Sequence, residues 1–348
     1  MNAGRPAPGK LGPLVTLAHG GGGRAMQDLI DTVFRSRFGS DAGTEDQARI
    51  ALATFTALGD RLAFTTDSYV VDPLFFPGGD IGVLAVNGTI NDLAVGGALP
   101  LALSCAVIIE EGLPTETLQR VAESMRLAAE AAGVRIVTGD TKVVNRGAAD
   151  KLFISTAGIG VIPAGVQIGA DQARPGDAVL VNGTIGDHGA TILNARGELA
   201  LEAPLRSDTR PLHTLVQAML AACTDIRCLR DATRGGLATV LNEFALASGV
   251  AITLDEAQLP VRDEVRGVCA ILGLDPLYFA NEGKLVAIVP AASAQAVLSA
   301  MRAHPAGVDA AVIGDVTSGP AGHVTMRTRF GGERIVDTLV GEQLPRIC

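Results

Sequence analysis

The side chain best placed for chemistry is the last one, Cys348, which ends the segment Gly341-Glu342-Gln343-Leu344-Pro345-Arg346-Ile347-Cys348. A thiol on a free chain end can be carried into an active site, and Pro345 would stiffen its approach. Chain ends are usually mobile, so the alternative is a frayed terminus that happens to stop at Cys. A prenylation signal is excluded, because it needs Cys four places from the end. The tail has meaning only if the rest of the chain is built for chemistry on a thiol.

A second group of candidates consists of aspartates that lie beside small or turn residues rather than on ordinary helix faces. Their carboxylate oxygens, together with water and phosphate oxygens, are ligands that suit Mg²⁺. Each one alone could be a turn residue or a helix cap. Taken together with the neighbouring glycines they favour a Mg–nucleotide site. The members are Asp46, Asp67, Asp92, Asp140 and Asp231.

Four consecutive glycines, Gly20, Gly21, Gly22 and Gly23, lead into a predicted helix over 24–38 with one apolar face. A glycine run at a helix N-terminus can cradle phosphate, and it can equally be a hinge. The chain has no G-x-x-x-x-G-K-[ST] motif and no G-x-G-x-x-G after a strand with an acidic partner. These absences argue against P-loop kinases and Rossmann dehydrogenases.

Composition narrows the class of protein further. The 348 residues predict about two domains, and the near absence of aromatic residues predicts an aliphatic core. A net charge of −9 argues against a nucleic-acid surface. Five cysteines without a C-x-x-C pair argue against zinc and fit a reducing cytoplasm. The longest apolar run, 99–109, is too short to span a membrane.

The first half of the chain predicts a mixture of helices and strands, which must position the candidate side chains. Strands are predicted over 50–57 and 62–66 around a hairpin turn at 58–61. Residues 82–97 predict a buried helix or a strand-turn-helix. A helix capped by Thr115 and ended by Gly133 follows a buried strand at 101–109. Further strands are predicted at 134–137 and 152–162.

The second half predicts another α/β unit after a Pro/Gly-containing connector at 163–177. The whole fold class is therefore α/β (α+β). Helices are expected at 188–197, 210–222, 234–248 and 292–303, and strands at 178–182, 225–230, 250–254, 284–289, 310–317 and 323–328. We predict a disordered N-terminus at 1–13, an N-terminal domain at 14–165, a C-terminal domain at 178–328 and a mobile tail at 329–348.

One short stretch recurs: Val86-Asn87-Gly88-Thr89-Ile90-Asn91-Asp92 is nearly repeated at Val181-Asn182-Gly183-Thr184-Ile185-Gly186-Asp187. The flanking residues do not align. The recurrence is either an internal duplication or a coincidence between two glycine turns.

The motifs around Thr65 to Asp92, Thr138 to Lys142, Asp231 to Gly236, Asn281 to Lys284 and the terminal Pro345 to Cys348 resemble the HypE family of hydrogenase maturation factors. This family of carbamoyl dehydratases belongs to the superfamily of aminoimidazole ribonucleotide synthetase and selenophosphate synthetase. The aspartate motifs are typical of the superfamily, and the terminal Pro-Arg-Ile-Cys is typical of this family. The resemblance runs from about His19 to Cys348.

The resemblance implies a two-domain PurM-like architecture, with an N-terminal ATP-binding domain that pairs into a homodimer. It also implies an activity. The carbamoyltransferase HypF places a carbamoyl group on Cys348, and ATP-dependent dehydration converts it to a thiocyanate. The cyanide then goes to the iron of a [NiFe] hydrogenase precursor, through an iron-cyanide assembly complex of HypC and HypD. Phosphorylation of the carbamoyl oxygen explains the need for ATP, because phosphate is a better leaving group than an amide oxygen.

The same resemblance assigns roles to individual residues. Asp46, Asp67, Asp92 and Asp140 are expected near Mg²⁺ and the phosphates. The glycine run, Asn91, Thr141 and Asp231 are expected at the nucleotide. Lys142 and Glu282 are the candidates to deprotonate the carbamoyl nitrogen or to stabilise charge there. The non-catalytic alternatives are that Lys142 is an ordinary surface charge and that Glu282 caps the following strand. His188 and His19 stay outside the predicted catalytic set.

Two rival functions remain open at this point. A related synthetase of the superfamily would act on a free small molecule with the same ATP site, and it would not need Cys348. A non-catalytic scaffold would bind maturation partners through its tail, and its binding would survive loss of Asp92 or Lys142.

Overall fold

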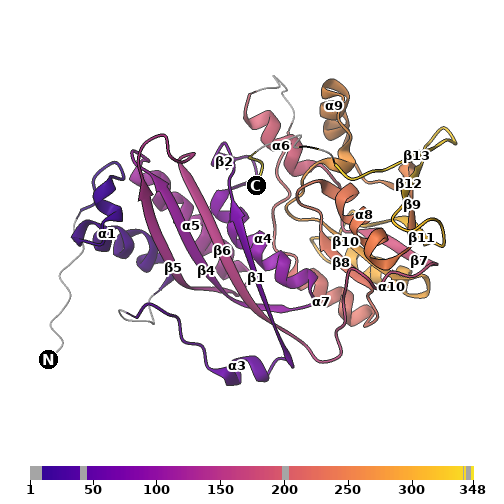
Figure 1. Cartoon of the computed structure of the whole chain (residues 1–348), viewed down its shortest axis with the longest axis horizontal. Helices are drawn as coiled ribbons and strands as arrows, with labels where there is room; N and C mark the ends of the chain where they lie inside the picture. Colours follow the sequence, from indigo (N-terminus) through magenta and orange to yellow (C-terminus); the bar gives the residue numbers. More distant parts are fainter. Residues whose placement is uncertain (1–9, 40–44, 198–203, 340, 342–345) are drawn as a thin grey trace.

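The computed structural model describes residues 10–39, 45–197, 204–339, 341 and 346–348. Two sheets lie side by side, each with its own helices, and the chain end lies between them (Figure 1). Residues 1–9 of the predicted disordered N-terminus, and 340 and 342–345 of the predicted tail, lie outside the described residues. Gly12 and Pro13, also predicted as disordered, accept hydrogen bonds from Thr115.

The first half forms a mixed four-stranded sheet with the order β1-β6-β4-β5. β4 and β5 are parallel, and the other pairs are antiparallel. A small two-stranded ladder of β2 and β3 precedes α4. The elements are α3 (Leu52–Thr56), β1 (Arg61–Tyr69), β2 (Phe75–Phe76), β3 (Gly79–Asp80), α4 (Ile81–Val95), β4 (Leu99–Glu110), α5 (Thr115–Ala131), β5 (Arg135–Val144) and β6 (Leu152–Ile162).

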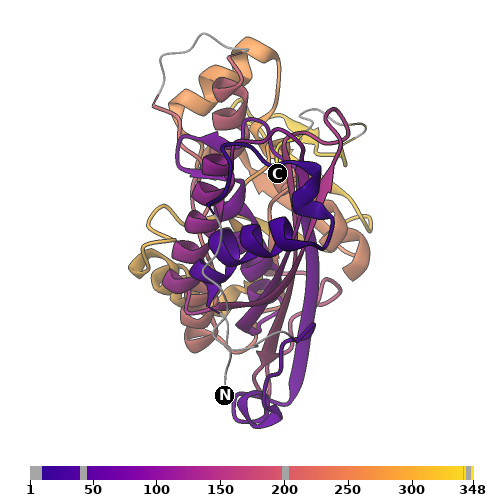
Figure 2. The ribbon, with the colours of Figure 1, turned by 90° about the vertical axis from the view of Figure 1, so that its left-hand side faces the viewer.

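Helices α4 and α5 cover one face of this sheet, and the other face is open (Figure 2). Side chains alternate along each strand, so every second residue points to the open face. Leu62, Phe64 and Ile108 on that face are 56%, 75% and 41% exposed. An apolar sheet face left open in this way is a feature of interaction surfaces.

The glycine run leads into a continuous helical segment, which confirms the predicted helix over 24–38. It consists of the 3₁₀ turn η1 (Leu17–Gly20), then α1 (Arg24–Leu29), the π-helical η2 (Ile30–Arg35) and α2 (Ser36–Phe38). Leu29 and Val33 are buried, and η1 and α2 contact β5. The segment therefore lies along the β5 edge of the sheet (Figure 1).

Helix α4 is buried on almost every side because its residues are small. The Asp80 carboxylate caps its N-terminus by accepting hydrogen bonds from the N–H groups of Gly82 and Val83, 2.8 and 3.0 Å away. A Cβ on Gly88 would lie 2.2 Å from the Tyr69 hydroxyl, and one on Gly82 would lie 2.7 Å from a carbonyl of α5. The glycines let α4 pack closely between β1, α5 and the second half of the chain.

The second half forms a seven-stranded sheet with the order β13-β12-β9-β11-β7-β10-β8. Helix α8 packs on one face, and α7 and α10 pack on the other. The elements are β7 (Asp177–Val181), α6 (Asp187–Ala195), α7 (His213–Ala222), β8 (Cys228–Asp231), α8 (Gly236–Ser248), β9 (Ala251–Asp255), η3 (Glu256–Gln258), α9 (Asp263–Leu272), η4 (Pro276–Tyr278), β10 (Leu285–Pro290), α10 (Ala291–Ala303), β11 (Ala311–Thr317), β12 (Val324–Arg327) and β13 (Glu333–Ile335).

The two halves share apolar core through α4. Ala94 and Val95 at its C-terminal end join the cluster that α7 and α10 form on the second sheet. Most predicted helices and strands of both halves are present within a few residues of their predicted bounds. The predicted α/β fold class is therefore confirmed.

Three local predictions were wrong. Residues 50–57 form the short helix α3 instead of a strand, so there is no hairpin at 58–61. The apolar run there contains three alanines, which favour helix over strand, and only Phe55 of α3 is buried. Thr115 is not the cap of α5: Pro114 is the N-cap residue, and the Thr115 hydroxyl donates to Gly12.

Several elements were missed, among them the short strands β2 and β3. Helix α9 was left unassigned, and β13 falls in the segment predicted to be tail from residue 329. β13 pairs with β12 in an antiparallel ladder, so regular pairing continues to Ile335.

The recurring heptapeptide does not form a structural repeat. Val86–Asp92 lies inside helix α4, whereas Val181–Asp187 runs from the end of β7 through a turn to the start of α6. The same residue types adopt different backbone structures in the two places, so the recurrence is a coincidence.

Candidate active site

The described end of the tail is docked against the first half of the chain. Ile347 forms an antiparallel bridge with Val71 and is buried in the core that α4 and α5 cover. Asp72 N–H and the Arg196 guanidinium both donate to the Arg346 carbonyl, at 3.3 and 2.6 Å. This docking carries Cys348 to the boundary between the two halves, where Figure 1 marks the C-terminus.

Glu282 is the carboxylate that meets the terminal thiol. It lies in the turn before β10, its side chain is 3% exposed, and it is hydrogen-bonded to Cys348. Its Oε1 has no hydrogen-bond partner within the part of the chain that the structure describes. A buried carboxylate oxygen without a partner is costly unless a donor arrives, so the site is prepared to accept an N–H group.

Burial controls the ionisation of this pair. It raises the pKa of Glu282 well above the usual range, and the charges of Asp208 and Asp231 raise it further. Burial also raises the pKa of the Cys348 thiol well above its usual range, with Glu282 adding to the effect and Arg234 opposing it. The docked thiol is therefore kept protonated and is a poor nucleophile in this position.

Three predicted aspartates lie close to this pair on three different elements: Asp67 on β1, Asp92 on α4 and Asp231 at the end of β8. Burial raises the pKa of Asp231 to about 7, and the charge of Asp92 adds to the rise. Burial also raises the pKa of Asp92, against a hydrogen bond of 2.8 Å from the Thr65 hydroxyl. These carboxylates repel one another at neutral pH.

The donor set fits a divalent cation. Hard carboxylate oxygens are what Mg²⁺ prefers, and a cation would remove the mutual repulsion of Asp67, Asp92 and Asp231. Among the described residues, no three His, Cys, Asp or Glu side chains already converge at metal-binding spacing. The residues present would therefore need oxygens from another source, such as phosphates, to complete a coordination shell.

A second group of predicted residues surrounds a separate cavity of about 680 Å³ between the first helical segment and β5. Asp46, Asp140 and Thr141 line it, with Phe34 and Met26 on the helical side. Its volume is within the range of small-molecule sites. Gly20 lies beside β5 as well, because a Cβ there would be 3.0 Å from Val143.

The structure separates Lys142 from Glu282. Lys142 is exposed and, like Asp140, lies on β5 in register with the alternate residues of β4 that face the open side, Ala106 and Ile108. The thiol and Glu282 lie with the elements on the covered side. The two predicted candidates for the same proton transfer are therefore on opposite faces of the first sheet within one chain.

Asn91 is used differently from the nucleotide contact that we predicted. Its side-chain N–H₂ donates to the carbonyls of Arg210 and Glu282, at 3.1 and 3.3 Å, and its oxygen accepts from Leu212 N–H at 2.7 Å. The amide thus connects α4 to the segment before α7 and to the turn that carries Glu282.

Sequence reasoning missed three residues that bear on the site. His188 donates from Nε2 to the Ile347 carbonyl at 2.7 Å, and Ser207 contacts the other ring nitrogen at 2.8 Å. Asp208, which is 4% exposed, contacts the turn around Glu282. His188 had a visible signal in Gly186-Asp187-His188-Gly189, whereas Ser207 and Asp208 lie in an irregular segment with no motif.

Comparison with known families agrees with the division into two sheets. Residues 45–162 match the family of AIR synthase related proteins, N-terminal domain, and residues 174–327 match the corresponding C-terminal domain. None of the described helices, in residues 10–39, 45–197 and 204–339, has the length and hydrophobicity that a membrane span requires.

Individual relatives are similar over almost their whole length. The chain is 60% identical to carbamoyl dehydratase HypE of Rhodobacter capsulatus, over 96% of this chain and 98% of the relative. It is 56% identical to the Escherichia coli K12 protein of the same name, over 96% and 99%.

Solved structures extend the similarity to the fold. E. coli HypE matches with a TM-score of 0.89 at 54% identity, covering 93% of this chain and 100% of that one. A HypE in complex with ATP matches with a TM-score of 0.90 at 50% identity, over 96% and 99%. A chain of a HypE–HypF complex matches with a TM-score of 0.78 at 45% identity, over 89% and 99%. The residues that suggested the resemblance, the two-part fold and these similarities agree, and the chain belongs to the HypE family of carbamoyl dehydratases of hydrogenase maturation.

Proposed function

We propose that this protein dehydrates a carbamoyl group on the sulfur of its own Cys348, at the expense of ATP, and leaves a thiocyanate there. The cyanide would then be passed to the iron of a [NiFe] hydrogenase precursor. The observation that carries the proposal is the buried, unpartnered Oε1 of Glu282 beside the terminal thiol.

The chemistry has two proton losses and one phosphoryl transfer. The carbamoyl oxygen takes the γ-phosphoryl group while the nitrogen loses one proton, which leaves an S-bound imidoyl phosphate. Loss of the second nitrogen proton then expels phosphate and forms the C≡N bond. With the carbamoyl group on Cys348, the nitrogen would lie within reach of Glu282. Burial raises the pKa of Glu282, which makes its ionised carboxylate a stronger base than an exposed glutamate.

The nucleotide is proposed to lie near the cavity that Asp46, Asp140 and Thr141 line, with the loop from Gly20 to Gly23 at its edge. The complex of a related HypE with ATP supports nucleotide binding by this chain, and the cavity volume supports the proposed position. Mg²⁺, when bound, would neutralise phosphate charge. Of its four predicted ligands, Asp67 and Asp92 lie near Asp231 and the thiol, whereas Asp46 and Asp140 line the separate cavity. Asp231 would contribute to the same charge balance.

Lys142 is better suited to phosphate than to the nitrogen proton. Its exposed position on the open face keeps it away from Cys348 in one chain. A cation there could stabilise charge on a nucleotide that is bound near a dimer interface. The assignment of the base therefore favours Glu282.

The open apolar face of the first sheet supports the proposed homodimer. Phe64, Leu62 and Ile108 would be covered if two copies paired through this face. The HypE–HypF complex supports HypF as the carbamoyl donor enzyme. A HypC–HypD complex remains the proposed acceptor of the cyanide.

A synthetase that acts on a free small molecule is the second candidate. The docking of Ile347 and Cys348 into the site disfavours it, because such an enzyme has no use for a terminal thiol at its carboxylate. It would keep its ATPase activity after the tail thiol is removed.

Intact mass spectrometry tests the proposal directly. The protein is carbamoylated by the carbamoyltransferase and its mass is recorded before and after Mg–ATP. We expect the modified wild type to lose the mass of one water, with release of phosphate, and we expect Cys348→Ala to accept no tail carbamoyl group. A carbamoyl adduct that survives Mg–ATP unchanged would contradict the dehydratase proposal for this chain.

A further inference from the structure

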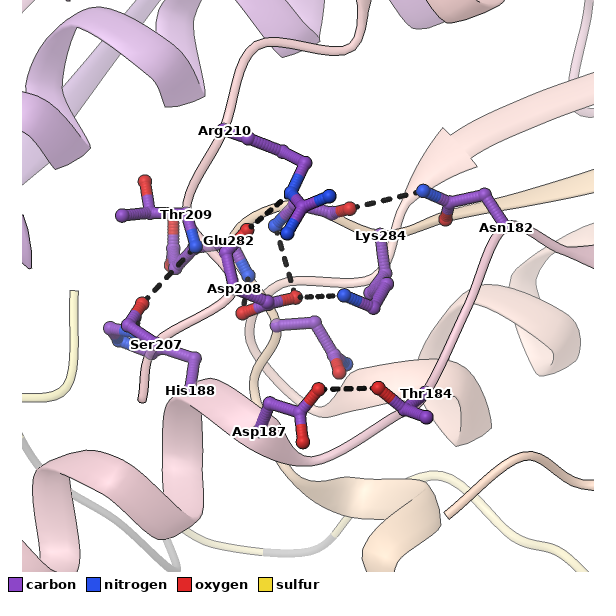
Figure 3. Close-up of polar contacts among 12 residues, drawn as sticks. Asn182, Thr184, Asp187, His188, Ser207, Asp208, Thr209, Arg210, Glu282 and Lys284 are labelled. Atoms are coloured by element: carbon purple, nitrogen blue, oxygen red, sulfur yellow. Dashed lines mark hydrogen bonds and ion pairs between the residues drawn. The ribbon is translucent and has the colours of Figure 1, made fainter. Parts of the chain in front are cut away.

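A polar segment lies beside Glu282 and His188 (Figure 3). It consists of the neighbours Ser207 and Asp208, in the stretch between α6 and α7 that the structure describes from residue 204. Asp208 is 4% exposed, so its charge is removed from water. None of the chemistry proposed above uses either residue.

Asp208 accepts hydrogen bonds from the turn that carries Glu282. Its Oδ1 accepts from the Glu282 N–H at 3.1 Å, and its Oδ2 accepts from the Gly283 N–H at 3.2 Å. The ammonium of Lys284, which is 5% exposed, lies 3.1 Å from the same Oδ2. Three consecutive residues of the turn are therefore held by one carboxylate, which remains ionised because Lys284 compensates its burial.

Ser207 acts on the opposite side, through His188. The Ile347 carbonyl can only accept, so His188 Nε2 carries the proton, and Nδ1 accepts from the Ser207 hydroxyl at 2.8 Å. The Ser207 oxygen in turn accepts from Thr209 N–H at 3.2 Å. This chain of donors fixes the tautomer and the orientation of the imidazole, and hence the position of the tail backbone next to Cys348.

The segment is itself anchored to the first half of the chain. Ser207 N–H donates to the Pro77 carbonyl at 2.9 Å, and the Thr209 hydroxyl accepts from Asn87 of α4 at 3.2 Å. Asn91 of the same helix holds Arg210 and Leu212. The segment is thus tied to α4, to the Glu282 turn and to the tail at once.

We propose that Ser207 and Asp208 are positioning residues, which bring the Glu282 carboxylate and the Cys348 sulfur into one site by holding the turn and the docked tail together. Asp208 fixes the position of the turn by accepting its N–H groups. Ser207 fixes the position of the tail backbone through its hydrogen bond to His188. The expected effect of these residues on the reaction rate rests on the proposed dehydration. Their expected effect on the position of the tail does not depend on that proposal. A displacement of about 1 Å between reacting groups can slow a reaction by ~100-fold.

The first experiment tests the role of Asp208 by measuring the dehydration rate that depends on Glu282. In Asp208→Asn the amide nitrogen cannot accept. Either the Glu282 N–H loses its acceptor, or the Gly283 N–H and the Lys284 ammonium both lose theirs. We expect single-turnover dehydration of the carbamoylated full-length protein to fall by about 10- to 100-fold at saturating Mg–ATP. The ATP concentration for half-maximal rate should not change, and tail carbamoylation should stay at the wild-type level.

A double variant separates positioning from loss of stability. If Asp208 acts through Glu282, Asp208→Asn should cause no further loss in a Glu282→Gln background. The proposed role of Asp208 would be overturned if the rate losses of the two single variants multiply in the double variant. It would also be overturned if Asp208→Asn alone dehydrates its tail within twofold of the wild-type rate. If the wild type itself fails to dehydrate its tail, the proposed function fails and the tail experiment below still decides the Ser207 half.

The second experiment measures the tail by the reactivity of its thiol. The other four cysteines are buried, so Cys348 is the residue that the aromatic disulfide DTNB should reach first. We expect Ser207→Ala and His188→Gln to speed this reaction several-fold, because the docked tail is held less firmly. Ser207→Thr keeps the hydroxyl and should behave as wild type.

Two control variants show whether a change in the DTNB rate reports on the tail. His304→Gln changes a histidine that bonds Thr214 far from the tail, and it should leave the thiol rate unchanged. Cys348→Ala should abolish the fast phase. Wild-type DTNB rates in both Ser207→Ala and His188→Gln would show that the segment does not hold the tail, and would overturn this half of the proposal.

Discussion

At the scale of residues, the site depends on one carboxylate whose ionisation is controlled by its surroundings. Glu282 is buried among Asp208, Asp231, Asp67 and the Cys348 thiol, and burial with these charges raises its pKa well above the usual range. Burial likewise raises the pKa of the docked thiol. The geometry therefore favours a role for Glu282 as a base toward the nitrogen of a carbamoyl group already on the sulfur, over nucleophilic attack by the docked sulfur.

Replacement of Glu282 tests the base directly. Glu282→Gln keeps the side-chain size but removes the proton acceptor, so we expect dehydration to slow by about 10²- to 10⁴-fold. Carbamoylation of the tail should continue, because the partner enzyme carries out that step. Single-turnover mass spectrometry measures both steps, and Glu264→Gln, on the exposed side of α9, is the matched control. An unchanged dehydration rate in Glu282→Gln would remove this residue from the mechanism.

The pH dependence of dehydration follows from the same pKa. Because Glu282 accepts a proton only when it is ionised, the rate should fall as the pH drops through its pKa. That pKa is raised, so the fall should occur at a higher pH than the ordinary titration of a glutamate. The measurement is the single-turnover rate against pH for wild type. A rate that stays flat down to the ordinary glutamate range would contradict this ionisation behaviour.

At the scale of elements, short irregular segments between regular ones position the chemistry. The turn at Asn281–Lys284 lies between η4 and β10 and is held by Asp208 from one side and by Asn91 from the other. Gly283 is needed there, since a Cβ would lie 2.1 Å from the Asp208 carbonyl oxygen. Close backbone approach thus sets the residue type at this position.

Gly283→Ala tests this close approach. The added methyl must push the Asp208 segment away, and we expect a loss of about 1–3 kcal/mol in the free energy of unfolding. Dehydration should slow as well, because the turn and the segment move apart. Gly267→Ala is the matched control: it lies in α9 with open space around it and should be neutral or slightly stabilising. Thermal unfolding of both variants, beside the dehydration rate, decides the point, and equal stability of the two would contradict it.

At the scale of the whole molecule, the two sheets meet along α4, and the tail closes over that boundary. The covered face of the first sheet lies on the side of the thiol, while its other face carries Asp140, Lys142 and the exposed Phe64. Pairing of two copies through the open face would bury this apolar surface and bring Lys142 into an enclosed site.

Phe64→Asp tests the pairing. A carboxylate in the centre of the paired face must be desolvated, so we expect the variant to shift toward monomer by sedimentation velocity while its circular dichroism stays unchanged. Leu246→Asp, which changes an exposed residue of α8 on another surface, should leave the assembly intact. Wild-type protein that sediments as a monomer at all concentrations would refute the dimer.

Much of the fold was accessible from sequence because regular elements have local signals. The apolar periodicity of α5 predicted that helix correctly, and α8 was also predicted. The small residues of α4 left a helix and a strand-turn-helix open, and the structure has the helix. The α3 region failed because a short alanine-rich run carries no reliable period. β13 was missed because a three-residue strand exists only through its pairing with β12.

The sequence by itself determined the family, through the terminal Pro-Arg-Ile-Cys and the aspartate motifs, and it predicted Glu282 and Cys348 as residues for chemistry. Tertiary structure decided which candidates meet. Register on β5 sends Lys142 and Asp140 to the open face, whereas docking of Ile347 on Val71 brings Cys348 to Glu282. Tertiary structure also brought in His188, which lies in a short glycine-containing signal, and Ser207 and Asp208, which lie in no motif. The physical reason is that the face on which a side chain lies depends on pairing between segments far apart in the chain, and no local pattern encodes that pairing.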